Sequence, residues 1–132
     1  MMIRRRGFTL IELIVVLTLI GILVGLALPE FRNSIKRAKE TVLKEDLFIF
    51  RKLIDQYYQD KGKYPLTLQA LVDEGYLRLM PQDPITKSAT TWVEIREQPS
   101  LEDYMPTGQL GVINVQSGSE AKALDGTFYN TW

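Results

Sequence analysis

The sequence contains no cysteine and no histidine among its 132 residues. Without histidine, neither a Ser-His-Asp triad nor a histidine-based metal site can be built. Without cysteine, thiol catalysis is excluded and the fold has no disulfide. A glycine-rich phosphate-binding loop is also missing, and neighbouring acids such as Asp73 and Glu74 are interpreted as solvated surface. The sequence therefore predicts that the protein is not an enzyme.

Net charge is absent as well, because 16 basic residues balance 16 acidic ones. A neutral chain gives no reason to expect nucleic acid or an anionic membrane surface as its ligand. The length leaves room for one soluble domain beside a membrane segment.

What the sequence does contain is a long apolar run, residues 8–28, preceded by three arginines. Every side chain in the run is apolar or small except Glu12. At a rise of about 1.5 Å per residue, such a helix crosses a hydrocarbon core of about 30 Å, so we predict a membrane helix. An ionised carboxylate inside it costs on the order of 1 to 3 kcal/mol unless it is paired. Three partners are open to Glu12: the helix N-terminus, the side chains of Arg5 and Arg6, and an amino group created at Phe8 by a cut after Gly7.

The stretch RRRGFTLIELIVVLTLIGILVGLALP, which ends at Pro29, resembles the leader and N-terminal helix of type IV pilins and type II secretion pseudopilins. This resemblance implies that a prepilin peptidase cuts between Gly7 and Phe8 and methylates Phe8. It also implies that Glu12 pairs with the amine of a neighbouring subunit during filament assembly. The basic leader would stay in the cytoplasm while the rest is exported. Loss of three arginines would leave 13 basic against 16 acidic residues, a net charge of −3.

Two other interpretations of the apolar run stay open. In the first, the run is a single-pass anchor in which Glu12 reaches the membrane interface. In the second, it is a secretory signal peptide cut after the small-x-small sequence Gly25-Leu26-Ala27.

Gly21 and Gly25 lie in the second half of the run, and Pro29 follows it. The G-x-x-x-G spacing can bring two membrane helices into close contact. Two glycines at about 1 kcal/mol each and a proline at about 3 make this the weakest stretch of the helix. We expect it to kink or unwind when subunits pack.

Beyond Pro29 the pattern becomes amphipathic and predicts that the same helix continues to about Gln59, where Gly62 closes it. The helix would be about 78 Å long. Its predicted apolar stripe, widened by Leu47, Phe50, Ile54 and Tyr58, consists of Ile35, Ala38, Val42, Ile49, Leu53 and Tyr57. The chain therefore divides into a leader (1–7), a membrane and assembly half of the helix (8–29), its amphipathic half (30–60) and a small domain (61–132).

The sequence pattern of residues 61–132 predicts an α+β, pilin-like fold in which the long helix packs on a small antiparallel sheet. A short helix is expected over residues 66–74, with Thr67 as its N-cap and Gly75 as its stop. Alternation predicts a strand over residues 90–97 with one face buried. Residues 98–109 are interpreted as a loop, residues 110–115 as a second strand and residues 128–132 as a short third strand.

This half resembles the major pseudopilin of type II secretion systems. The residues that carry the resemblance are Gly62-x-Tyr64-Pro65, the sequence Leu-Met-Pro-Gln-Asp-Pro at 79–84, Asp125-Gly126 and the terminal Tyr-Asn-Thr-Trp. Typical members bind calcium in an acidic loop. Here the loop 117–126 has only Glu120 and Asp125 as carboxylates, so calcium is an open expectation with Asp125 as the candidate ligand.

These observations predict a structural subunit of a periplasmic filament that is anchored in the inner membrane by one helix, with the small domain in the periplasm. Its expected partners are copies of itself, prepilin peptidase, an inner-membrane assembly platform and minor pseudopilins, but no nucleic acid. A close alternative is the major subunit of a type IV pilus. An alternative from a different class is a monomeric, membrane-anchored binding domain.

Overall fold

The computed structural model describes residues 6–99 and 110–132. Its elements are the helices α1 (Leu10–Lys61) and α2 (Gln69–Asp73), the strands β1 (Val93–Arg96) and β2 (Val112–Gln116), and the 3-10 helix η2 (Tyr129–Thr131). The chain divides into two compact units, Met1–Lys36 and Arg37–Trp132, and the boundary falls inside α1. The predicted α+β fold, a long helix packed on a small antiparallel sheet, is confirmed.

Helix α1 begins two residues later and ends two residues later than the sequence pattern predicts. Its C-terminal end is closed by Gly62, whose N–H donates to the carbonyl of Tyr58 at 2.8 Å. Gly62 has φ +71°, a left-handed conformation that glycine adopts without strain. The predicted stop is therefore confirmed.

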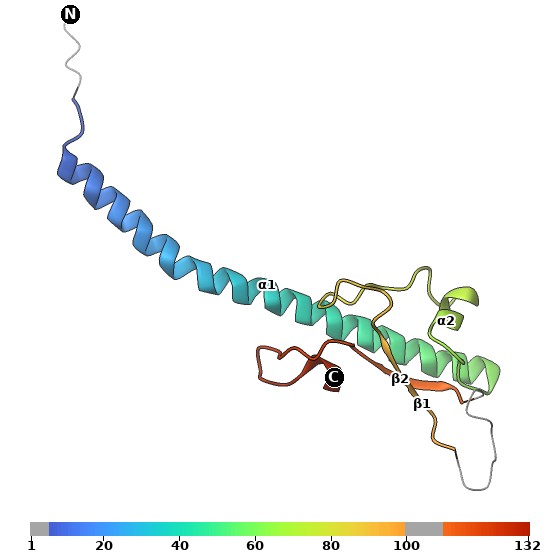
Figure 1. Ribbon diagram of the computed structural model, residues 1–132. Helices are drawn as coiled ribbons and strands as arrows, with labels where there is room; N and C mark the ends of the chain where they lie inside the picture. Colours follow the sequence, from blue (N-terminus) through green and yellow to red (C-terminus); the bar gives the residue numbers. More distant parts are fainter. Residues whose placement is uncertain (1–5, 100–109) are drawn as a thin grey trace, which may run out of the picture. The chain divides into compact units, whose positions relative to one another are not determined.

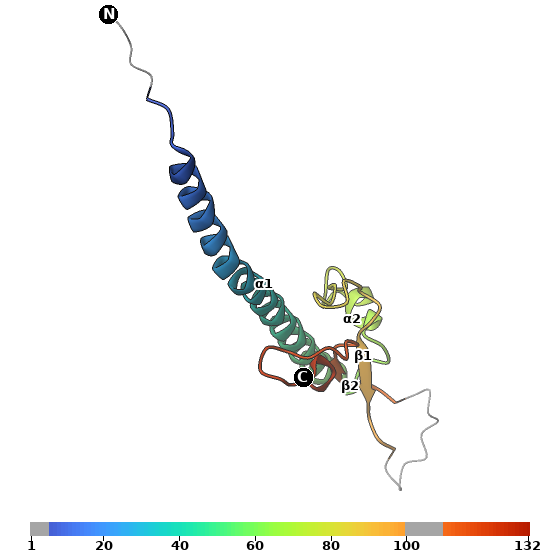
Figure 2. The same cartoon turned by 60° about the vertical axis from the view of Figure 1, so that its left-hand side comes forward.

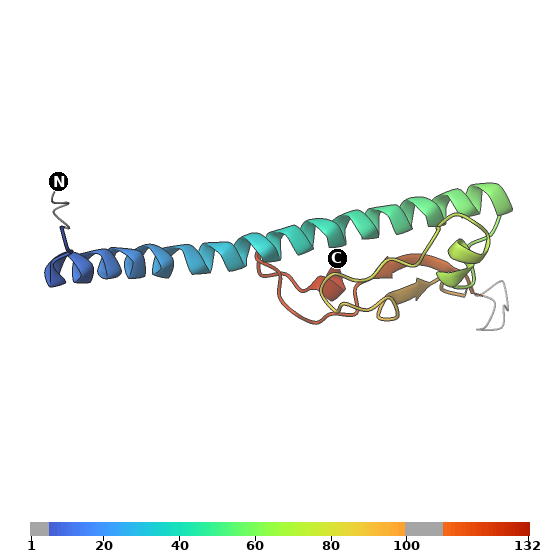
Figure 3. The ribbon, with the colours of Figure 1, turned by 90° about the horizontal axis from the view of Figure 1, so that it is seen from above.

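Within the second unit, α2, both strands and the chain's last residues gather along α1 (Figure 3). The residues of α1 that face this layer follow a heptad-like spacing and are Glu40, Leu43, Leu47, Phe50, Ile54 and Tyr57. The predicted stripe is wrong in its centre, because Val42 is 50% exposed and Ile49 is 36% exposed. Two apolar stripes run side by side on this helix, and the domain covers the one that begins at Leu43. Phe50 is at the middle of the core, in edge-to-face contact with Trp92 at 5.0 Å.

The sheet has two antiparallel strands in the described part of the chain, β1 and β2, which are hydrogen-bonded neighbours (Figure 2). Val93 pairs with Gln116 and Arg96 pairs with Val112, with a register shift between Ile95 and Arg96. Trp92, just before β1, is buried, while Val93, the first residue of the strand, is exposed.

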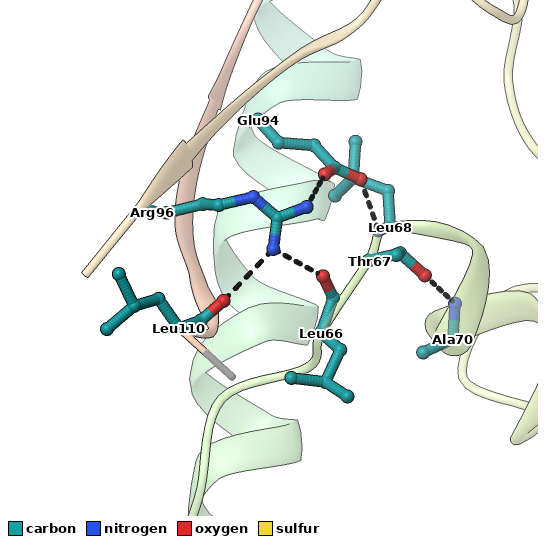
Figure 4. Close-up of polar contacts among 7 residues, drawn as sticks. All are labelled: Leu66, Thr67, Leu68, Ala70, Glu94, Arg96 and Leu110. Carbon is teal, nitrogen blue, oxygen red and sulfur yellow. Dashed lines mark hydrogen bonds and ion pairs between the residues drawn. The ribbon is translucent and has the colours of Figure 1, made fainter. Parts of the chain in front are cut away.

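The inward polar residues of β1 hold the neighbouring loop (Figure 4). The Glu94 carboxylate accepts the N–H of Leu68 at 2.8 Å and pairs with Arg96. The Arg96 guanidinium donates to the carbonyls of Leu66 and Leu110 at 2.7 and 3.0 Å. These bonds tie the chain before α2 and the start of β2 to one strand.

Helix α2 is shorter than the predicted helix over 66–74. The hydroxyl of Thr67 still accepts the N–H of Ala70 at 3.3 Å, as expected of a capping residue, although the helix proper starts at Gln69 (Figure 4). Gly75 has φ +84° and ends the helix as predicted.

The predicted third strand over 128–132 is wrong. Residues Tyr129–Thr131 form η2, and a single bridge between Lys122 and Phe128 is the only strand-like pairing there among the described residues. The turn at Asp125 and Gly126 brings these two residues together, but the chain then coils, with the N–H of Trp132 donating to the carbonyl of Tyr129. Most of the predicted loop 98–109, namely residues 100–109, lies outside the described residues.

Candidate assembly and processing site

The sequence-predicted site residues Gly7, Phe8 and Glu12 lie around the start of α1. Gly7 and Phe8 are exposed and precede the helix, which begins only at Leu10. The Thr9 hydroxyl accepts the N–H of Glu12 at 3.2 Å, so Thr9 caps the helix. The bond between Gly7 and Phe8 is therefore outside any helical hydrogen-bonded turn, in backbone that another protein can reach.

Thr9 is a site residue that the sequence analysis missed. Thr9 and Glu12 have the T-x-x-E spacing of a capping box, in which the residue three places after the cap is an acid. The signal was present in the sequence but was read only as part of the apolar run. The cap explains why α1 starts at Leu10, and it places Glu12 in the first turn.

Glu12 is exposed and has no ion-pair partner among residues 6–99 and 110–132. The partial positive charge of the helix N-terminus is worth at most about 1 kcal/mol at an exposed position. The first of the expected partners is thus present but weak. Arg6, the described member of the arginine group, forms no ion pair with Glu12 in this structure, and Arg4 and Arg5 lie outside the described residues.

The apolar part of α1 has no partner among the described residues of its own unit. Its most hydrophobic 18-residue window has a mean hydropathy of 2.8 and no buried residue, so by length and composition this helix can cross a membrane. Leu10 is 75% exposed and Leu26 is 71% exposed. At about 25 cal/mol per Å² of apolar surface, such a helix is strongly driven towards lipid or another apolar helix.

Gly21 and Gly25 have no neighbouring atoms where a side chain would stand, so nothing in the described chain requires glycine there. Each glycine costs a helix about 1 kcal/mol relative to alanine. Pro29 lies inside α1 and has no N–H to donate to the carbonyl of Gly25. The helix nevertheless continues through Pro29, so unwinding in this stretch stays a prediction for the packed state.

Asp125 is used by its own turn. One carboxylate oxygen accepts the N–H of Thr127 at 2.9 Å and its hydroxyl at 2.6 Å. The hydroxyl and the backbone N–H of Thr127 lower the pKa of Asp125. Among the residues the structure describes, no three metal-ligating side chains come together, whereas calcium prefers about six to eight oxygens, several from carboxylates. The side chains described around Asp125 do not fit such a shell.

Comparison with known proteins agrees with this geometry. The family model described as the prokaryotic N-terminal methylation motif matches residues 2–28. The chain is 35% identical over 97 residues to the type II secretion system core protein G of Klebsiella pneumoniae, covering 61% of this chain and 69% of that protein. It is 36% identical over 97 residues to core protein G of Pseudomonas aeruginosa, with 61% and 68% covered. It is 31% identical over 97 residues to that of Escherichia coli K12, with 61% and 67% covered. No solved structure matches the chain.

An N-terminal methylation motif on a long apolar helix, followed by a small α+β domain, defines the class of pilin-like subunits. Matches to core protein G run beyond the motif into the rest of the chain. Within that class, the chain belongs to the type II secretion system core protein G family, the major pseudopilins.

Proposed function

We propose that the protein is the structural subunit of a periplasmic pseudopilus, processed between Gly7 and Phe8 and assembled from the inner membrane by packing α1 against copies of itself. The observation that carries the proposal is an exposed apolar helix whose first turn holds an acid. Among the described residues of its unit, neither the helix nor this acid has a partner. The relatives are structural pseudopilin subunits, and the proposed role is likewise structural rather than enzymatic.

The cap at Thr9 leaves the proposed cleavage site outside the helix. Because the helix starts after Phe8, prepilin peptidase would meet an exposed Gly7-Phe8 bond outside the helix. The cut would remove the arginines and leave a charged amine on Phe8. Methylation by the same enzyme keeps that charge, so the new N-terminus is the cation that Glu12 lacks.

The pairing outweighs the cost of placing Glu12 in an apolar setting. Two unit charges about 4 Å apart attract by about 4 kcal/mol at an effective dielectric constant near 20. An unpaired carboxylate near the membrane interface costs on the order of 1 to 3 kcal/mol. If the amine comes from a neighbouring subunit, the gain appears only on assembly. A single polar contact of this kind also fixes the register between helices.

The rest of the helix supports the same role. Gly21 and Gly25 leave room for a second backbone to approach, which is the known use of small residues spaced by four. Pro29 leaves the carbonyl of Gly25 without its helical hydrogen bond, so a local change of helix conformation between these residues breaks fewer hydrogen bonds. We assign the anchor to residues 8–29 and the periplasmic part to the residues that follow. Membrane platform proteins, minor pseudopilins and prepilin peptidase are the partners this role requires.

The test replaces Glu12 in the full-length precursor, expressed with its secretion system. We expect Glu12→Ala to insert into the membrane and to be cut at the usual bond, but to give few filaments in sheared fractions and electron micrographs. Glu30→Ala, which removes an exposed acid further along α1, is the matched control and should assemble normally.

Mass spectrometry of the mature N-terminus completes the experiment. Methylated Phe8 is the expected first residue in all three proteins. A chain that begins at Met1 or Leu28 would contradict the processing step, and a normal filament yield from Glu12→Ala would contradict the role of Glu12.

A further inference from the structure

Residues 121–132, here called the C-terminal segment, lie against α1 in the second unit (Figure 1). Three charged side chains of α1 contact this segment: Glu40, Lys44 and Arg51. The segment contributes no residue to β1 or β2, so ladder hydrogen bonds do not hold it there. Apolar packing of Ala123 and Tyr129 in the core and polar contacts with α1 hold it instead.

Glu40 makes the most buried of these contacts. It is only 8% exposed, and its Oε1 accepts both the N–H of Leu124 and the hydroxyl of Tyr129 at 2.8 Å. Tyr129 is itself buried, and burial together with this bond raises the pKa of its hydroxyl, which keeps the donor proton in place. A carboxylate is stable in such a position only when hydrogen bonds satisfy it, so acid and segment fix each other.

Lys44 and Arg51 hold the end of the segment. The ammonium of Lys44 lies 4.8 Å from the centre of the Trp132 ring, a cation–π distance. The Arg51 guanidinium donates to the carbonyl of Trp132, and also to the side chain of Asn114 at 2.8 Å and the carbonyl of Val115 at 3.3 Å. The Arg51 guanidinium therefore connects α1 to strand β2 and to the C-terminal segment through three hydrogen bonds.

The hydrogen bonding of the C-terminal segment gives no indication of a bound cation. The described residues include no buried side-chain nitrogen or oxygen without a hydrogen-bond partner. Asp125 is engaged by Thr127, and Glu120, the other carboxylate of the preceding loop, is exposed. The donor set thus disagrees with the calcium site that the family resemblance leads one to expect.

We propose that Glu40, Lys44 and Arg51 form a metal-free latch that holds the C-terminal segment on α1, in the place where a calcium ion would otherwise order the loop. Glu40 is the central positioning residue, since it bonds two points of the segment at once. The latch belongs to the single subunit and does not depend on the proposed filament.

Hydrogen exchange on the full-length protein in detergent micelles tests the latch. In Glu40→Ala, exchange of the backbone amides of residues 121–132 should rise by roughly tenfold or more, as expected when a bond worth about 1.4 kcal/mol is lost. The amides of β2 should keep their wild-type protection. Glu40→Gln retains an acceptor oxygen and should stay near wild type, and Glu45→Gln, at an exposed position of the same helix, is the control for lost charge.

Tyr129→Phe gives a milder variant if Glu40→Ala does not fold. It removes one hydroxyl and leaves the ring packed, so faster exchange confined to the segment is expected. Unchanged exchange in Tyr129→Phe, or in a folded Glu40→Ala, overturns the latch.

The wild-type protein supplies the metal arm of the test. Exchange in the segment should be the same in excess EDTA and in millimolar calcium chloride. A several-fold slowing by calcium, reversed by EDTA, would mean that a cation orders the segment and would overturn the metal-free proposal.

Discussion

Phe48 and Phe50 offer a direct test of which side of α1 faces the domain. Residues two positions apart on a helix are rotated by about 200° about its axis, so these rings point to opposite sides. Phe50 is fully buried against Trp92, whereas Phe48 is 62% exposed. We expect Phe50→Ala to destabilise the second unit by about 3 to 5 kcal/mol, the usual cost of deleting a buried aromatic ring. Phe48→Ala should change stability by less than about 0.5 kcal/mol.

The assay must follow tertiary structure, because we expect the apolar part of α1 to stay helical in micelles after the domain unfolds. Near-ultraviolet circular dichroism reports Trp92 and the buried tyrosines, and for a unit of this size a loss of 3 kcal/mol lowers Tm by more than about 12 °C. Phe50→Leu, which keeps an apolar side chain, should fall between wild type and Phe50→Ala. Equal losses from Phe48→Ala and Phe50→Ala would refute the rotation of α1 described above.

Two further predictions concern charge and capping. Burial first, and then the charges of Asp83 and Glu45, raise the pKa of Asp46, so the folded state binds its proton more readily than the unfolded state. Asp46→Asn should therefore raise Tm at pH 7. This gain in Tm should shrink as pH falls towards 3.8, the ordinary pKa of aspartate. A gain in Tm that grows on acidification would contradict a raised pKa of Asp46. Thr9→Ala should weaken the first turn of α1 by about 0.5 to 2 kcal/mol, seen as faster exchange of the Glu12 amide, while Thr9→Ser should preserve it.

The methylation motif could be recognised in the sequence because its signals are local. Gly7, Phe8 and Glu12 stand within six residues of one another, and the apolar run that follows is continuous. The stops at Gly62 and Gly75 were equally local, since a left-handed residue after a helix favours glycine. Even here the cap at Thr9 was missed, although its spacing to Glu12 was visible.

The inner face of α1 could not be predicted from periodicity. Val42 and Ile49 repeat at the same helical spacing as Leu43 and Phe50, and both stripes are apolar. Only the surface presented by the domain selects one of them. Periodicity also gives no sign that Glu40 is buried, because its partners, Leu124 and Tyr129, lie 84 and 89 positions away.

The last residues were mistaken for a strand for a related reason. Aromatic residues such as Phe128 and Tyr129 favour strands, but a strand needs a neighbour with free ladder groups. Here the chain meets helix side chains instead. Contacts with Lys44 and Arg51 then stabilise a coiled conformation that has no signature in the sequence.

The bond between Arg51 and Trp132 has a practical consequence for labelling the protein. A fluorescent reporter or affinity tag placed next to Trp132 would pull on a residue whose carbonyl and indole are both engaged. A flexible glycine-serine spacer would relieve that strain. The exposed loop position Glu120 is an alternative insertion point, since neither α1 nor the sheet uses its side chain.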